Sequence, residues 1–265
     1  MDRNDRARTG PRVAIVTGAS RGIGRAIVLA LAAEGMALSL AARDAEALEA
    51  VKTEALAKGA PEVLCFPGDL TETEVPAQIV SETVSILGGL DVLINNAGAT
   101  KRGDFLELSD TDHLDGFALK YHAAVRFCRA AWPHLTHDRG VILMISGIGA
   151  HTPRADFTVG GPVNSAMINF AKALAHKAGG GAPRVNVVCP GHVVTDRLAF
   201  RVQAHAEATG LSLDDAREAL REAAGIARYG TPEDIAAMVA FLCSDAASYV
   251  HGAVLNVDGG ATPGL

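Results

Sequence analysis

Closely spaced glycines near the N-terminus form the clearest candidate binding site. The stretch Thr17–Gly24 lies between a short apolar run at 13–16 and a helical pattern at 22–34. Glycine allows positive φ and close approach to a phosphate, and the following helix offers free N–H groups and partial positive charge. We predict a phosphate-binding turn, with tight packing alone as the alternative. Its predicted cofactor-binding residues are Gly18, Ser20, Arg21, Gly22, Ile23 and Gly24.

This turn and later motifs resemble the short-chain dehydrogenase/reductase family. The motifs are TGASRGIG, Gly68-Asp69-Leu70, Asn95-Asn96-Ala97-Gly98, Pro190-Gly191 followed by Thr195, and Val257-Asp258-Gly259-Gly260. They span nearly the whole chain in the family's order. The resemblance implies a Rossmann-type α/β fold and an oxidoreductase acting with NAD(P) on a small carbonyl or alcohol. Further cofactor-binding residues implied by it are Asp69, Leu70, Asn96, Ala97, Gly98, Pro190, Gly191, Val193 and Thr195.

The end of the second predicted strand favours NADP over NAD. An acidic side chain there binds the ribose 2′-OH, whereas an arginine accommodates a 2′-phosphate. The sequence has Ala41 and Ala42, then Arg43, and Arg21 adds a second guanidinium. Two solvated arginines are the alternative, and Asp44 is a counter-signal because its carboxylate could reach the ribose.

The resemblance also implies a catalytic Tyr, a Lys four residues later, a Ser and an Asn. Neighbouring residues align the Tyr position with Gly160 and the Lys position with Asn164. The Ser position falls on Gly147, one residue after Ser146, and the Asn position falls on Lys120. The usual side chains are therefore absent, which makes the chain an atypical member. A short gap would bring Phe157 opposite the Tyr position, but its ring has no hydroxyl.

Lys120, Ser146 and His192 are the candidate catalytic substitutes. Lys120 is expected to point toward the space that Asn164 vacates, where a buried lysine can act as acid or base or hold the ribose. An inert lysine paired with Asp115 or solvent is the alternative. His192 suits proton transfer near neutral pH. Two further candidates are His151 for the same pocket and Arg154 for a substrate carboxylate.

Three functions stay open on these residues. The first is an NADP-dependent oxidoreductase with a rebuilt proton relay. The second is a catalytically degenerate, dinucleotide-binding pseudoenzyme that acts through partners. The third is a non-redox enzyme, such as a dehydratase or isomerase, in the same pocket.

The elements expected to position these residues alternate between apolar strands and helices. Strands without polar alternation, separated by helices, indicate a doubly wound parallel sheet in three layers and a single domain. We predict that domain over 12–265, a disordered tail at 1–11 and a helical substrate lid at 195–226. Predicted strands are 13–16, 37–41, 63–66, 92–94, 141–145, 185–188 and 254–257; predicted helices are 22–34, 45–58, 73–87, 112–135, 163–177 and 232–242.

The net charge and the composition exclude several classes of binding partner. The net charge of −6 argues against nucleic acid and anionic membranes, and the sequence has no apolar run of about 18 residues. The four cysteines are scattered and the histidines lack metal-ligand spacing, so we expect a reduced, cytoplasmic protein without a metal. The family resemblance implies a homotetramer or a dimer.

Overall fold

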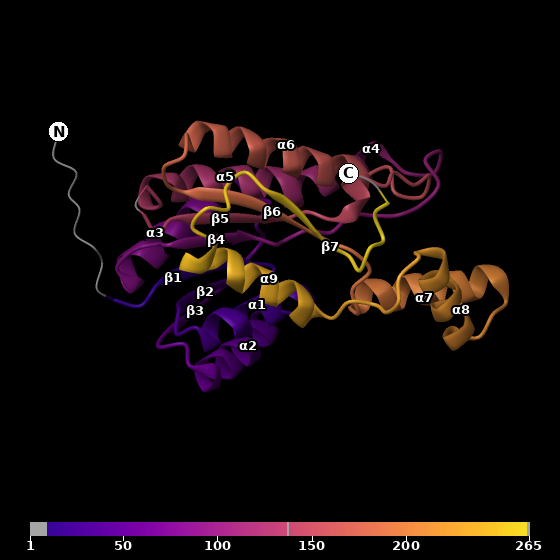
Figure 1. Ribbon diagram of the computed structural model, residues 1–265, viewed down its shortest axis with the longest axis horizontal. Helices are drawn as coiled ribbons and strands as arrows, with labels where there is room; N and C mark the ends of the chain where they lie inside the picture. The colour runs from indigo at the N-terminus through magenta and orange to yellow at the C-terminus, as the bar shows by residue number, and fades with distance from the viewer. Residues whose placement is uncertain (1–9, 137, 264–265) are drawn as a thin grey trace.

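The computed structural model describes residues 10–136 and 138–263 and contains one seven-stranded parallel sheet. The strand order is β3-β2-β1-β4-β5-β6-β7 (Figure 1). This confirms the predicted single-domain, doubly wound α/β fold. The strands are β1 Val13–Thr17, β2 Ala37–Ala42, β3 Val63–Pro67, β4 Val92–Asn95, β5 Val141–Ile145, β6 Arg184–Pro190 and β7 Val254–Val257.

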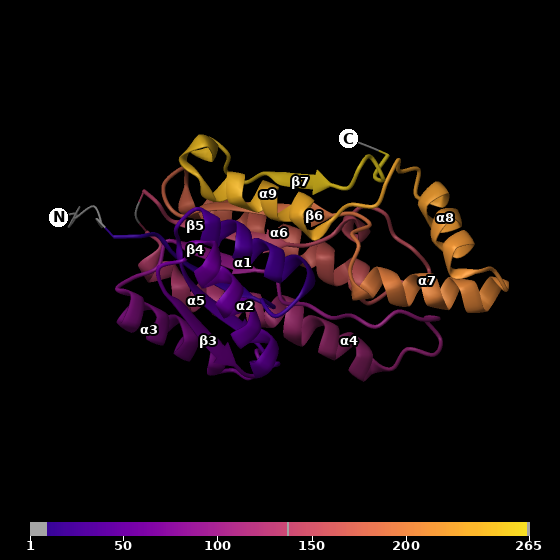
Figure 2. The same ribbon diagram turned by 90° about the horizontal axis from the view of Figure 1, so that it is seen from below.

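The central strands are aliphatic because helices cover both faces of the sheet. Every residue of β1, β2 and β5 is buried. Helices α1 (Gly22–Ala33), α2 (Ala45–Lys58) and α9 (Pro232–Cys243) pack on one face. Helices α3 (Val75–Leu87), α5 (Ala123–Ala131) and α6 (Gly160–Ala178) pack on the other (Figure 2).

The strand order reverses beside β1, and this reversal creates the place for a ligand. Val16 of β1 is in register with Leu40 of β2 on one side and with Ile94 of β4 on the other. The connections after β1 and β4 therefore leave in opposite directions. In open α/β sheets, ligands bind in the crevice at the carboxyl ends of strands at such a point.

The helix predicted over 112–135 is not continuous, so that prediction was wrong. Helix α4 (Asp110–Phe117) begins with a capping box between Ser109 and Asp112 and then runs into a π-helical turn, η1 (Ala118–His122). Helix α5 follows, and Trp132–His134 forms a 3₁₀ turn. A π turn holds one residue more than an α turn and is frequent at functional sites. Here it contains Lys120.

Two helices, α7 (Asp196–Thr209) and α8 (Leu213–Ala223), occupy the segment predicted as a lid. They project beyond the carboxyl ends of the strands (Figures 1 and 2). A small apolar cluster of their own, including Val202, Ala216 and Tyr229, holds them together. Of the predicted tail, residues 1–9 lie outside the described residues. No helix within 10–136 and 138–263 could cross a membrane.

Candidate functional site

The glycine turn has the backbone geometry that its sequence predicts. Gly18 and Gly22 have φ of 65° and 54°. A Cβ on Gly24 would lie 2.0 Å from the carbonyl oxygen of Gly18, so α1 can approach β1 only with glycine there. Among the described residues, no side chain caps α1, and its first turn holds no acidic residue. The free N–H groups at this helix start therefore suit a phosphate.

Hydrogen bonds join this turn to the end of β4. Thr17 Oγ1 accepts from the backbone N–H groups of Asn96 (2.9 Å) and Ala97 (3.0 Å). Asn96 Nδ2 donates to the carbonyl oxygens of Thr17 (3.0 Å) and Gly18 (3.1 Å). Two motifs almost 80 residues apart are thus parts of one crevice edge.

The motif after β6 reaches the same edge. A Cβ on Gly22 would lie 3.5 Å from Cγ2 of Thr195, so Thr195 faces the glycine turn. Gly191 packs against Asp258 so closely that a Cβ would lie 2.6 Å from its Cα. Val193 is buried and bridges to Gly230.

The two charged residues that follow β2, Arg43 and Asp44, have different environments. Asp44 Oδ1 accepts from the N–H of Ala47 (3.0 Å), so this carboxylate caps α2. Arg43 is exposed. Hydrogen bonds from Thr71, and then the charge of Arg43, lower the pKa of Asp69. Leu70 beside it is buried.

Arg21 is engaged elsewhere. Its Nη1 lies 2.9 Å from Asp196 Oδ2 at the start of α7, and both side chains are exposed. Within the described residues, no hydrogen bond or ion pair joins the guanidinium groups of Arg21 and Arg43 to a common partner. The ion pair with Asp196 instead ties the glycine turn to the start of α7.

Lys120 is the buried cation of the site. Its Nζ donates to the backbone oxygen of Ser146 (2.9 Å) and to Oδ1 of Asn164 (2.6 Å). Burial, and secondarily the charge of Arg197, lower its pKa from 10.5 to about 7. The lysine thus points into the space beside Asn164, and neither of these two hydrogen bonds is to Asp115.

The hydroxyl of Ser146 turns toward the same helix. Its Oγ donates to the backbone oxygen of Asn164 (2.9 Å). A Cβ on the next residue, Gly147, would lie 3.0 Å from Nδ2 of Asn164. The end of β5, Lys120 and Asn164 therefore form one compact polar cluster.

The ring of Phe157 lies where a side chain on Gly160 would begin. A Cβ on Gly160 would be 2.0 Å from Cζ of Phe157, and one on Gly149 would be 2.6 Å from its Cε1. These two glycines leave the room that the ring fills. The space over the start of α6 thus holds an aromatic ring without a hydroxyl.

His192 is held as a neutral imidazole. Its Nδ1 lies 2.9 Å from Nη1 of Arg201. A guanidinium has no acceptor, so Nδ1 accepts and the ring proton is assigned to Nε2. Burial, and then the charges of Arg201, Arg154 and Arg102, lower the pKa of His192 to about 4. At neutral pH it offers an N–H donor and has little acidic form. His151, beyond β5, is exposed.

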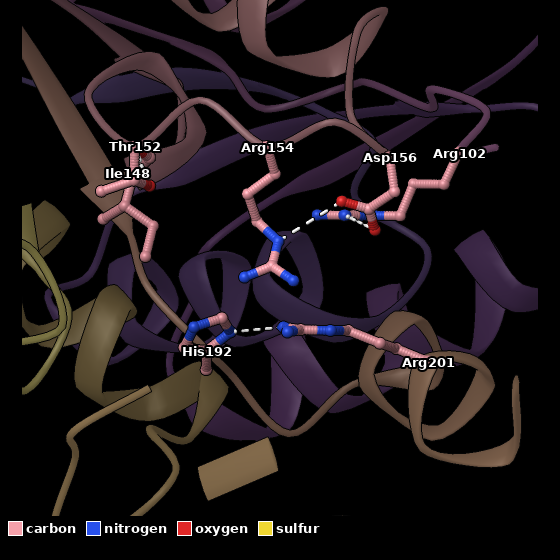
Figure 3. Close-up of polar contacts among 7 residues, drawn as sticks. All are labelled: Arg102, Ile148, Thr152, Arg154, Asp156, His192 and Arg201. Carbon is pink, nitrogen blue, oxygen red and sulfur yellow. Dashed lines mark hydrogen bonds and ion pairs between the residues drawn. The ribbon is translucent and has the colours of Figure 1, made fainter. Parts of the chain in front are cut away.

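The sequence analysis named Arg154 but did not predict three other arginines of the site, Arg102, Arg197 and Arg201. Arg201 contacts His192 (Figure 3). The guanidinium carbon of Arg102 lies 3.9 Å from the centroid of the Phe157 ring. Arg197 donates to the backbone oxygen of Gly98 (3.1 Å). The signal in the sequence was the spacing of Arg197 and Arg201, because residues four apart share one face of a helix.

The known proteins that this chain resembles in sequence include reductases and a dehydrogenase. Residues 18–262 match the family described as Enoyl-(Acyl carrier protein) reductase. The meso-2,3-butanediol dehydrogenase of Serratia marcescens is 32% identical, covering 95% of this chain and 94% of its own. The NADPH-dependent reductase BacG of Bacillus subtilis is 33% identical, covering 94% and 97%.

Solved structures give the same result. The L-sorbose reductase of Gluconobacter frateurii, complexed with NADPH and L-sorbose, superposes with a TM-score of 0.87 at 30% identity. The match covers 97% of this chain and 98% of that chain. The similarity therefore spans the glycine turn, the sheet and the helices that carry the polar cluster.

Proposed function

Because the chain belongs to the short-chain dehydrogenase/reductase family, we propose that it is an NADP(H)-dependent oxidoreductase in which Lys120 replaces the family's usual catalytic side chains. Its substrate is a small carbonyl compound or alcohol. The observation that carries the proposal is the buried Nζ of Lys120, held by Ser146 and Asn164. The Tyr and Lys positions of the family are assigned to Gly160 and Asn164. Glycine has no side-chain functional group, and the amide of asparagine does not exchange a proton near neutral pH.

The residues of the crevice fit a dinucleotide. The positive φ of Gly18 and Gly22, and the α1 start without a side-chain cap, suit its diphosphate. Asp69, Leu70, Asn96 and the segment from Pro190 to Thr195 are assigned to its other parts. When bound, a nicotinamide cofactor supplies or accepts the hydride. Arg43 supports NADP over NAD, since Asp44 is already used as a helix cap.

We assign to Lys120 the proton that is exchanged with the substrate oxygen during hydride transfer. With a pKa near 7, its amine can both release and take up a proton at neutral pH. An ammonium has three N–H donors, and Ser146 and Asn164 accept two of them. The third remains for a substrate oxygen or for a ribose hydroxyl. Asn164 is thus a positioning residue that orients the lysine.

Ser146 and His192 receive narrower roles. The Ser146 hydroxyl proton is committed to the backbone of Asn164, so the residue anchors α6 against the end of β5. His192 is assigned a hydrogen bond from Nε2 to the substrate carbonyl, because a pKa of about 4 leaves little acid at pH 7. Neither is assigned the transferred proton.

A dinucleotide-binding protein without turnover is the second candidate. The observation that favours it is the Phe157 ring, which fills the space over Gly160 without offering a hydroxyl. Lys120 is then a structural cation that holds α6 to β5. Direct measurement of turnover separates the two functions.

The deciding experiment begins with calorimetric titration of the pure protein with NADPH and with NADH. Loss of NADPH absorbance is then followed over a panel of aldehydes, ketones and oxo acids, using the wild type, Lys120→Met and a matched control, Lys58→Met. Lys58 is exposed at the end of α2.

Tighter binding of NADPH, and turnover lost only in Lys120→Met, are the expected results. A Lys120→Met rate equal to that of the wild type would remove Lys120 from the chemistry. NADPH binding without turnover on the whole panel would favour the second candidate. Assembly as a homotetramer or dimer and a cytoplasmic location remain predictions; light scattering checks the former.

A further inference from the structure

We propose that the substrate carries an anionic group, a carboxylate or a phosphate, which Arg102, Arg154 and Arg201 bind beside the reacting carbonyl. These three residues are called the arginine trio below. The inference rests on the proposed function, because it assigns the anion to the substrate of that same crevice.

The trio comes from three separate segments. Arg102 follows β4, Arg154 lies in the connection from β5 to α6, and Arg201 lies on α7. Figure 3 shows their side chains converging on one region, with the guanidinium of Arg154 between Asp156 and the Arg201–His192 pair. Convergence of like charges from distant segments requires a reason, because each pair repels.

The arginine trio carries more positive charge than the neighbouring carboxylate neutralises. Asp156 pairs with both Arg102 (2.7 Å) and Arg154 (3.3 Å). Within the described residues, Arg201 has no carboxylate within 4 Å, and its polar partner is the neutral ring of His192. Three guanidinium groups therefore face one carboxylate. An anion that enters relieves the repulsion and gains charge-assisted hydrogen bonds.

The trio is also accessible without being fully solvated. The side chains of Arg102 and Arg154 are 32% and 57% exposed, and burial lowers the pKa of Arg201. Partial burial strengthens an ion pair relative to one on an open surface. Planar guanidinium groups suit the bidentate oxygens of carboxylates and phosphates.

The location connects the anion to the reaction. Arg102 stacks on Phe157, whose ring lies against Gly160 at the start of α6. His192, which contacts Arg201, follows the carboxyl end of β6. An anion held by the trio thus lies beside the place assigned to the carbonyl. This geometry points to small oxo acids or oxo phosphates in which a few bonds separate the two groups.

Binding to the protein saturated with NADP⁺, which has no hydride to give to a carbonyl probe, tests the inference independently of turnover. The probes are pyruvate, phenylpyruvate and 2-oxoglutarate against their methyl esters, and dihydroxyacetone phosphate against dihydroxyacetone. Calorimetry measures each affinity for the wild type, Arg201→Gln, Arg154→Gln and a matched control, Arg129→Gln. Arg129 is an exposed arginine of α5, outside the trio.

We expect at least one anionic probe to bind about tenfold or more tightly than its neutral counterpart, as one charge-assisted hydrogen bond provides. Arg201→Gln and Arg154→Gln should remove that preference, and Arg129→Gln should retain it. The carboxylate and phosphate arms identify which anion the trio takes.

Equal affinities of acids and neutral counterparts, or a preference that survives Arg201→Gln, would overturn the inference. Turnover of neutral carbonyls with no charge preference would overturn it while leaving the proposed function intact. Anion binding with no turnover would support the inference and remove the proposed function.

Discussion

Nζ of Lys120 lies 2.6 Å from Oδ1 of Asn164, across 44 residues of chain. The pair joins the π-helical turn η1 to α6 at the carboxyl end of β5. In the alignment proposed above, the family's usual lysine would instead come from α6. Because the amide oxygen accepts from the amine without neutralising it, the burial penalty stays with Lys120 and keeps its pKa near 7.

The pH dependence of the rate follows from that pKa. If Lys120 donates the proton during carbonyl reduction, kcat/KM should be constant below pH about 7 and fall about tenfold per pH unit well above it. Alcohol oxidation, which needs the neutral amine, should show the opposite trend. Lys120→Arg, which stays charged, should leave NADPH affinity nearly unchanged while losing turnover. A profile with no inflection between pH 6 and 8 would contradict proton transfer by Lys120.

Thermal stability should depend on pH because of the same lowered pKa of Lys120. The folded-state pKa is about 7 and the ordinary value 10.5, so between these values the unfolded chain binds more protons and stability rises with pH. Below pH about 7 both states are protonated and the buried charge has its full cost.

The Tm of Lys120→Met relative to the wild type should therefore be most favourable at pH 6 and least favourable near pH 10. Each kcal/mol corresponds to about 2–4 °C in a domain of this size. The substitution also removes the two hydrogen bonds of Nζ, and this loss lowers the Tm of the variant about equally at pH 6 and pH 10. The change of the Tm difference with pH is therefore the quantity to measure. A Tm difference independent of pH would show that the lysine is not strongly perturbed.

Phe157→Tyr should increase turnover. The new hydroxyl extends from Cζ, the ring atom closest to the side-chain direction of Gly160. A positioned acid contributes about 10²–10⁴-fold, so a gain of at least about tenfold in kcat is expected. Phe157→Leu serves as the control, since it removes the ring that Arg102 stacks on without adding a donor. A folded Phe157→Tyr protein with unchanged kcat would place the ring away from the reacting carbonyl.

Gly160→Ala should destabilise the protein through the Phe157 ring. The added Cβ would lie 2.0 Å from Cζ, so the ring must move, at a cost of about 1–3 kcal/mol. In a Phe157→Ala background, the same change should be neutral or favourable, because alanine suits a helix better than glycine. A double-mutant cycle from urea unfolding measures the coupling. Additive effects would mean that ring and glycine do not compete for space.

Arg43→Ala should weaken NADPH binding by about tenfold or more, the value of a charge-assisted hydrogen bond, and change NADH binding little. Arg21→Ala is the comparison, since Arg21 is already paired with Asp196. Calorimetry with both dinucleotides decides. An equal loss for NADPH and NADH would assign Arg43 to a part common to the two cofactors.

Local pattern by itself determined the sheet, most helices and the glycine turn. Unbroken aliphatic runs predict buried parallel strands, and glycine at 18, 22 and 24 is required by backbone geometry within one turn. These features depend on contacts close in sequence or on strand and helix periodicity. That Lys120 faces Asn164 was predicted instead from the resemblance to the family, and the two residues are 44 apart in the chain.

Only the tertiary structure decided what these side chains contact. The π turn at Lys120 interrupts a sequence with continuous helical periodicity, and the engagement of Ser146 with α6 depends on packing between β5 and that helix. The arginine trio is assembled from segments about 50 residues apart in the chain, with no local pattern in common. Long-range packing sets those distances, and through burial and mutual repulsion it sets the charge state of Lys120 and His192.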